Sequence, residues 1–155
     1  MPAKKKSAYA PMNKAVAALW LSLAVSACAT PPARDAQAEV RAFIDRFIRA
    51  VNEPNVDDFV ASFAVDATAF FPSPENAARR VGREDIRRAV APTFMQGPGR
   101  TIVARDLTIS VAGDTAYVSF DAGVDRMHAR RTLVLRQIDG AWAVAHLHAS
   151  NVSEK

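Results

Sequence analysis

Cysteine is nearly absent from this sequence: Cys28 is the single one, so no disulfide bond can form within the chain. Acidic residues are missing from positions 1–27. The basic residues of this segment are Lys4, Lys5, Lys6 and Lys14. Without these four lysines the chain keeps 16 of its 20 basic residues, which balance its 16 acidic residues. Because nucleic-acid binding needs a concentrated excess of Lys and Arg, this neutral remainder indicates that nucleic acid is not a partner.

The sequence also has no apolar run long enough for a membrane-spanning helix, which needs about 20 residues. Residues 15–27 are apolar, follow a cationic segment, and are stopped by Pro31-Pro32. A charged segment followed by about 7–15 apolar residues is typical of a secretory signal peptide. We therefore predict that residues 1–27 are a signal peptide, with Met12 as a second candidate start of translation.

The apolar segment ends in Val25-Ser26-Ala27-Cys28, which resembles the bacterial lipobox. That resemblance implies cleavage before Cys28, acylation of this cysteine and a lipid anchor, stabilised by about 0.8 kcal/mol for each buried CH₂. Ala29, in place of an aspartate, favours by the same resemblance the periplasmic side of the outer membrane. The alternative is ordinary secretion to the periplasm, since the residues around Cys28 also fit an A-x-A-like cleavage site. Residues 28–34 are then a tether before a folded domain at 35–151.

Hydrophobic periodicity predicts helices first and a run of long strands afterwards. Helices are expected at residues 35–52, at 56–63 and from residue 83, where Pro92 kinks or ends the helix, with short strands at 66–71 and 77–81. Long strands are expected at 101–112, 115–124, 127–138 and 141–150, joined by the two-residue turns Gly113-Asp114, Asp125-Arg126 and Asp139-Gly140. Separate runs of helices and strands are typical of an α+β fold.

The two-residue turns set a register for the long strands, because directly opposed residues share a face of the sheet. This register places His146 opposite Leu133 and His148 opposite Arg131. The predicted inner face, which the helices cover, includes Arg105, Phe120, Arg131, Trp142, His146 and His148. The opposite face carries Tyr117, Ser119, Thr132, Val134, Ala141, Ala143, Ala145 and Leu147. Because this face is small and semi-apolar, we expect it to form a homodimer interface.

Several short motifs follow one another in a characteristic order. They are Val81-Gly82-Arg83-Glu84-Asp85-Ile86, Gly113-Asp114-Thr115-Ala116, and a DG-x-W…H-x-H-x-S pattern formed by Asp139, Gly140, Trp142, His146, His148 and Ser150. With the helix-helix-strand opening, they resemble the NTF2-like superfamily, specifically its SnoaL-like and DUF4440-type branch, over about residues 35–151. The last motif also resembles the association domain of calmodulin-dependent kinases.

This resemblance implies a cystatin-like cone, in which a curved antiparallel sheet wraps around about three helices and encloses a pocket, usually in a dimer. It implies no single activity, because members include isomerases, cyclases, dehydratases and non-catalytic binding modules. The ketosteroid isomerases of the superfamily use a tyrosine on the first helix, where this chain has Phe43 and Phe47. That difference argues against isomerase chemistry of their kind.

Basic side chains gather at one end of the predicted inner face. A histidine can act as an acid or a base near neutral pH, and a neighbouring Arg131 favours its neutral form. We therefore predict His146 and His148 as catalytic residues, with a role as pocket-lining side chains as the alternative. The predicted ligand-binding residues are Arg131, Arg105, Phe120, Trp142 and Phe47, of which Trp142 alternatively belongs to the core. No cofactor and no metal site is predicted, because the register places His128 away from the other histidines.

A buried arginine needs an anionic partner, which is either a protein carboxylate such as Asp66 or Asp106, or a ligand. The leading hypothesis is a lipid-anchored envelope protein that binds a small, partly apolar, anionic molecule without turnover. One alternative is a SnoaL-type enzyme that performs acid–base chemistry on a hydrophobic carbonyl compound. Another is a dimeric interaction module with a vestigial pocket.

Overall fold

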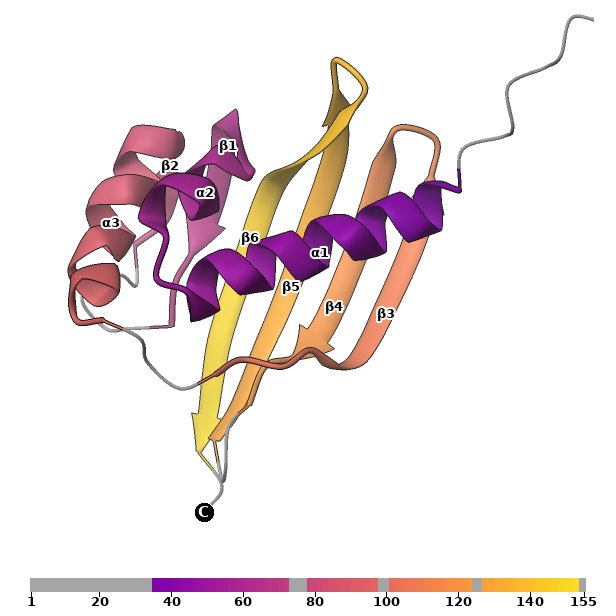
Figure 1. Cartoon of the computed structure of the whole chain (residues 1–155). Coiled ribbons are helices and arrows are strands. Elements are labelled where there is room, and N and C mark those ends of the chain that lie inside the picture. The colour runs from indigo at the N-terminus through magenta and orange to yellow at the C-terminus, as the bar shows by residue number, and fades with distance from the viewer. Residues whose placement is uncertain (1–34, 73–77, 98–100, 124–126, 154–155) are drawn as a thin grey trace, which may run out of the picture. The chain divides into compact units, whose positions relative to one another are not determined.

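Three helices lie on one face of a six-stranded sheet (Figure 1). The computed structural model describes residues 35–72, 78–97, 101–123 and 127–153. The helices are α1 (Ala36–Asn52), α2 (Val56–Ala61) and α3 (Arg83–Met95). The strands are β1 (Phe63–Phe70), β2 (Arg80–Val81), β3 (Arg105–Ala112), β4 (Thr115–Asp121), β5 (Met127–Ile138) and β6 (Ala141–Ser153). The predicted α+β class is confirmed, whereas the predicted signal peptide, Cys28 and the tether lie outside the described residues.

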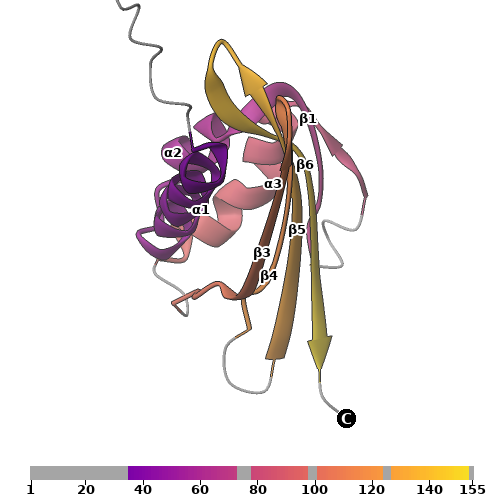
Figure 2. The ribbon, with the colours of Figure 1, turned by 90° about the vertical axis from the view of Figure 1, so that its right-hand side faces the viewer.

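The sheet has the strand order β2-β1-β6-β5-β4-β3, with β1 and β6 parallel and the other neighbours antiparallel. Figure 2 shows the sheet nearly edge-on, with all three helices on the same side. We call the side that the helices cover the inner face and the opposite side the outer face. Within the described part of the chain, no helix has the length and apolar character needed to cross a membrane.

Helices α1 and α2 begin where polar side chains cap them. A side-chain oxygen of Asp35 accepts a hydrogen bond from the N–H of Ala38 (3.0 Å), and Asn55 does the same for Asp58 (3.0 Å). The apolar stripe of α1 is buried against the sheet and comprises Val40, Phe43, Ile44, Phe47 and Ala50. Both helices therefore form where capping residues and apolar spacing predict them.

The glycine of the Val81–Ile86 motif lets β2 turn into α3. Gly82 has φ 81° and ψ 158°, a conformation that is essentially restricted to glycine. A Cβ atom there would lie 3.3 Å from the carbonyl oxygen of Val65, while its own N–H donates to the carbonyl of Ala67 at 2.7 Å. Both the backbone conformation and the close approach to β1 therefore require glycine here.

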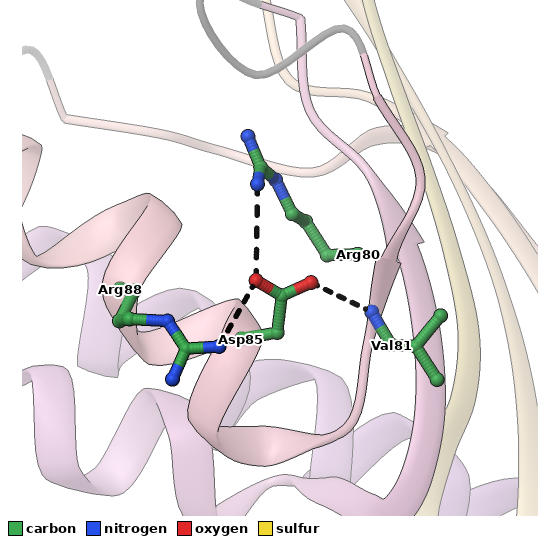
Figure 3. Close-up of polar contacts among 4 residues, drawn as sticks. All are labelled: Arg80, Val81, Asp85 and Arg88. Atoms are coloured by element: carbon green, nitrogen blue, oxygen red, sulfur yellow. Dashed lines mark hydrogen bonds and ion pairs between the residues drawn. The ribbon is translucent and has the colours of Figure 1, made fainter.

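The acidic residue of the same motif joins β2 to the first turn of α3 (Figure 3). Asp85 accepts a hydrogen bond from the backbone N–H of Val81 (3.1 Å) and forms ion pairs with Arg80 (3.7 Å) and Arg88 (3.4 Å). A carboxylate in the first turn also suits the positive end of the helix dipole. Pro92 lies within α3, and the helix continues past it to Met95.

The register predicted for β5 and β6 is correct only up to Val144. Beyond that residue Val134 pairs with His146, so Ala145 is an additional residue that forms a β-bulge. A shift by one residue reverses which face each side chain occupies. After the bulge, Leu147 and Ala149 point to the inner face, and His146 and His148 point to the outer face.

The bulge coincides with the place where β1 joins β6. Phe63 lies opposite Val144, and the N–H of Val144 donates to the carbonyl of Ser62 at 2.9 Å. The pairing of β1 then breaks and resumes with Thr68 opposite His146. Both strands of this parallel pair are therefore irregular at the same level of the sheet, and the pairing itself depends on residues far apart in the sequence.

A second irregularity lies in β3. Arg105 pairs with Asp121, whereas Thr108 pairs with Ser119, so β3 has one residue in excess, next to Asp106 with its φ of 51°. The predicted inward position of Arg105 is therefore wrong, and its side chain is exposed. The residues that pack against the core before this bulge are Ile102 and Ala104. Between β4 and β5, in contrast, the predicted register is confirmed, with Phe120 opposite Arg131.

Candidate functional site

A cavity of about 330 Å³ lies between the helices and the inner face of the sheet. Helix α1 contributes Phe47, Ile48 and Val51, while α2 and α3 contribute Phe59, Ala89, Val90, Thr93 and Phe94. The sheet contributes Phe120, Arg131, Leu147 and Ala149, and connecting segments add Phe71, Pro72, Ile102 and Ala122. The predicted inward positions of Phe120 and Arg131 are confirmed by this arrangement, which also places Phe47 on the cavity wall.

The helical wall of the cavity is built on packed aromatic rings. The ring of Phe59 lies 5.0 Å from that of Phe47, 5.2 Å from that of Phe63 and 5.2 Å from that of Phe94. Tilted and edge-on ring pairs at such distances add about 0.5–1.5 kcal/mol each beyond the burial of apolar surface. This wall is therefore apolar, and its ring contacts join α1, α2 and α3 to one another and to β1.

Small residues create the space on the sheet side. Ala122 and Ala149 line the cavity next to Arg131, and Ala129 is buried beside them. Ala129 accepts a hydrogen bond from the N–H of Ala122 at 2.6 Å, which keeps the end of β4 close to β5. Because alanine fills so little volume, the inner face recedes here and a cavity remains above it.

Arg131 is the only charged side chain among the described residues that line the cavity. Its Nη1 donates to the backbone carbonyl oxygens of Arg130 (2.9 Å) and Ser150 (3.2 Å), which anchor the guanidinium at the end of β5 and β6. Burial lowers the pKa of Arg131, and the nearby charge of Asp121 opposes that effect. In the described part of the chain, Nε and Nη2 of Arg131 have no hydrogen-bonding partner. These atoms form a planar donor fork that suits a carboxylate.

One side of the cavity is closed by the segment before β3. Asn52, at the end of α1, accepts a hydrogen bond from the N–H of Ile102 (2.8 Å) and donates one to its carbonyl (2.9 Å). This two-way contact satisfies both backbone polar groups of Ile102 and fixes its side chain against the cavity. The Asn52 amide therefore acts as a clamp between α1 and the segment 101–104.

The predicted catalytic histidines do not line this cavity. The Ala145 bulge turns both to the outer face, where Oγ1 of Thr68 lies 2.7 Å from Nδ1 of His146. The ring of Phe70 contacts His146 and His148 at centroid distances of 6.0 and 5.8 Å. Burial lowers the pKa of His146, as does the nearby charge of His148. The prediction that these histidines face the pocket is therefore wrong.

Comparison with known proteins decides the family. The SnoaL-like domain family matches residues 40–154 of this chain. The chain belongs to that family. Among curated proteins, none matches the sequence.

Solved structures place this SnoaL-like domain in the NTF2-like fold. An NTF2-like protein of unknown function from Pseudomonas putida KT2440 is 26% identical, with a TM-score of 0.66, over 74% of this chain and 85% of that protein. A ketosteroid isomerase-like protein from Erwinia carotovora atroseptica is 16% identical, with a TM-score of 0.63, over 79% and 100%. A protein with a cystatin-like fold from Nostoc punctiforme is 18% identical, with a TM-score of 0.59, over 75% and 90%. The predicted NTF2-like, cystatin-like fold is confirmed.

Other predicted site residues of the SnoaL-like domain lie away from the cavity. Trp142 is buried on the inner face, but its Nε1 donates to a carboxylate oxygen of Glu39 (3.3 Å), and its ring lines a separate polar groove beside Phe43 and Arg46. Arg105 is exposed, as described above. The side chain of His128 lies outside the described residues, and the described ones contain no group of three His, Cys, Asp or Glu side chains that could hold a metal ion.

The predicted register did not place Leu147, Ala149 and Ile102 on the inner face, although the sequence contains a pattern that indicates their positions. Inward apolar side chains of β6 lie at even positions up to Val144 and at odd positions from Leu147 onwards. The same change occurs between Ala104 and Leu107, which flank the irregularity in β3. A change of parity within one strand indicates a β-bulge. Phe59 and Phe94, in contrast, approach each other through helix packing, for which the sequence has no local signal.

Proposed function

We propose that the SnoaL-like domain binds a small, partly apolar molecule that carries an anionic group, with Arg131 as the anchor for that group. The observation that carries this proposal is the guanidinium of Arg131 in a cavity whose other described lining residues are apolar except Thr93. Its Nε and Nη2 have no hydrogen-bonding partner among the described residues. An arginine remains charged at neutral pH even when burial lowers its pKa. A carboxylate is the group that its donor fork matches best.

The size and walls of the cavity support a small ligand with one apolar part. A volume of about 330 Å³ lies at the lower end of the range for ligand pockets. The aromatic wall around Phe59 and Phe94 offers contact area. On the helices, the one side-chain hydrogen-bond donor among the described lining residues is the Thr93 hydroxyl. A ligand with an aliphatic or aromatic body and one anionic end fits this distribution of groups.

Binding without turnover is favoured over acid–base catalysis. Of the described residues that line the cavity, none is His, Asp, Glu, Lys, Tyr or Cys, so a general base is missing from this part of the wall. His146 and His148, the candidate bases of the enzyme hypothesis, lie on the outer face. Arg131 can hold an anionic group, but it does not remove a proton, because its pKa is too high.

A matched pair of ligands tests the proposal. Octanoate and the neutral octanamide have nearly the same apolar body, so isothermal titration calorimetry with both isolates the effect of the charge. A hydrogen bond to a charged group contributes about 1.5–3 kcal/mol, so octanoate is expected to bind about tenfold to a hundredfold more tightly. Arg131→Met should abolish that preference and leave octanamide unaffected, whereas Arg131→Lys should keep part of it. Equal affinities of the wild type for both ligands would contradict the proposal.

We also propose that the domain is tethered to the cell envelope through a lipid on Cys28, with residues 1–27 as the signal peptide and the periplasmic side of the outer membrane as its location. The support is the lipobox-like segment that ends at Cys28. Mass spectrometry of the mature protein from a Gram-negative host should find an acylated Cys28 as its first residue. Cys28→Ser should then move the protein from the membrane fraction to the soluble fraction. An unmodified first residue beyond Cys28 would support ordinary secretion instead.

We also propose that the domain forms a homodimer through its outer face. The residues on this face differ from those that the sequence predicts. Leu147 leaves this face because of the bulge, while Tyr117, 46% exposed, and the half-buried Val134 remain on it. Sedimentation equilibrium should detect a dimer that Tyr117→Arg weakens by more than about tenfold, since a desolvated charge at an interface costs several kcal/mol. Met95→Arg, at an exposed position at the end of α3, is the matched control. A wild type that is monomeric at every concentration would exclude this interface.

A further inference from the structure

The two histidines on the outer face form a pair of their own. Leu147, which points inward, lies between His146 and His148 in β6. Both histidine side chains therefore project from the outer face, with about 6.6 Å between their Cα atoms. Two imidazoles at this spacing on one face can reach a common metal ion between them. In the isolated chain His148 is exposed and His146 is half-buried, so the pair is accessible to a metal ion before any dimer forms on this face.

The neighbouring strand orients both rings. Thr68 and Phe70 of β1 lie opposite His146 and His148, respectively. The Thr68 hydroxyl lies 2.7 Å from Nδ1 of His146, so in the tautomer whose Nδ1–H donates to Thr68, Nε2 has a free lone pair. Metal-binding histidines use this arrangement, in which the nitrogen that does not bind the metal is held by a second polar group. The Phe70 ring packs against both imidazoles and limits their rotation.

We propose that His146 and His148 chelate one late first-row divalent metal ion, Cu²⁺ most tightly, with water in the remaining coordination positions. Imidazole nitrogens prefer such metals to Mg²⁺ or Ca²⁺, and among them Cu²⁺ has the highest affinity for a given nitrogen site. Two adjacent nitrogen ligands with open positions fit its tetragonal coordination. The site is separate from the cavity, since both side chains lie on the opposite face of the sheet.

Charged side chains flank the pair on the outer face. Metal binding requires neutral imidazoles, which are the main form of a histidine side chain above about pH 6.5. On one side, Arg136 lies opposite Ala143 of β6 and forms an ion pair with Asp66. Arg130 lies opposite Ser150, farther along β6. Arg130 is therefore two residues along this face from His148 and four residues from His146.

Copper titration of the mature protein without a histidine tag tests this inference. Electron paramagnetic resonance of the Cu²⁺ complex should show two imidazole nitrogens. His146→Asn and His148→Asn should each leave one nitrogen and weaken binding by more than about tenfold, because losing a ligand costs at least as much as losing a supporting residue. Thr68→Val should weaken binding by about tenfold. His128→Asn, which changes the remaining histidine of the chain, should have no effect.

Several outcomes would overturn the inference. They are the absence of Cu²⁺ binding, equal affinity in the wild type and the His146→Asn/His148→Asn double variant, or a spectrum with a single nitrogen in the wild type. Circular dichroism shows whether each variant is folded, and Thr68→Val leaves both ligands in place if a histidine variant does not fold. Octanoate affinity should not change in any folded variant of this series, so failure here is distinguishable from failure of the proposed binding function.

Discussion

The hydroxyl oxygen of Thr68 lies 2.7 Å from Nδ1 of His146, across the parallel pairing of β1 with β6. This contact is possible only because the Ala145 bulge turns His146 away from the helices. Because of this bulge, the two faces of the sheet differ in chemistry. The inner face holds an apolar cavity with one arginine, and the outer face holds the histidine pair.

The first prediction concerns the histidines and the cavity. The double substitution His146→Ala/His148→Ala should change octanoate affinity by no more than about twofold, since substitutions remote from a site rarely exceed 0.5 kcal/mol. Arg131→Met should remove most of that affinity. Calorimetry on the two variants makes the comparison. A tenfold loss in the histidine variant would mean that these residues do act on the cavity ligand.

The second prediction concerns the small residue beside Arg131. Ala149→Leu adds carbon atoms to the cavity, so it should abolish octanoate binding and raise the free energy of unfolding by about 1–2 kcal/mol. Ala42→Leu, at an exposed position of α1, should leave binding unchanged. Urea denaturation and calorimetry provide the two readouts. Undiminished binding by Ala149→Leu would place the ligand elsewhere.

The third prediction concerns the Asn52 clamp. Asn52→Ala leaves the N–H and the carbonyl of Ile102 without their partner, so it should lower the free energy of unfolding by about 2 kcal/mol. Ligand affinity should also fall, because Ile102 lines the cavity. Gln37→Ala, on the exposed side of α1, is expected to stay within about 0.5 kcal/mol of the wild type. Equal stabilities of the two variants would argue against the clamp.

The fourth prediction compares two glycines with positive φ. Gly82→Ala should lower the free energy of unfolding by about 1–3 kcal/mol, because its conformation is restricted to glycine and the new Cβ approaches Val65. Gly113→Ala, at φ 60° with no atom within 4 Å of the new Cβ, should cost less, about 1 kcal/mol. Thermal or urea unfolding measures both. The reverse order would contradict the role assigned to Gly82.

The fifth prediction concerns pH and the metal-free protein. The folded state lowers the pKa of His146, so the unfolded chain binds more protons as the pH falls below about 6.5. Above that pH, His146 therefore contributes nothing to the free energy of unfolding through protonation. As the pH falls further, it lowers the free energy of unfolding until the imidazole of the folded state is also protonated. NMR titration should find the pKa of His146 below that of an ordinary histidine, and His148→Asn should raise it. An unchanged pKa in that variant would contradict the repulsion between the two rings.

Local features of this chain were predictable because they depend on neighbours in the sequence. Apolar spacing and the caps Asp35 and Asn55 account for α1 and α2, and the turn at Asp139-Gly140 accounts for the β5–β6 hairpin. The pairing of Phe120 with Arg131 followed from the short connection between β4 and β5. Local rules alone therefore predict that Arg131 lies on the inner face.

The sequence by itself determined the α+β class, the order of the elements, and an arginine on the inner face. Only the tertiary structure decided which face holds the histidines, because the bulge at Ala145 forms where β1 pairs with β6, and that pairing joins segments far apart in the chain. The irregularity near Asp106 likewise exposes Arg105. Simple alternation assumes an unbroken strand, and one additional residue reverses every assignment that follows it.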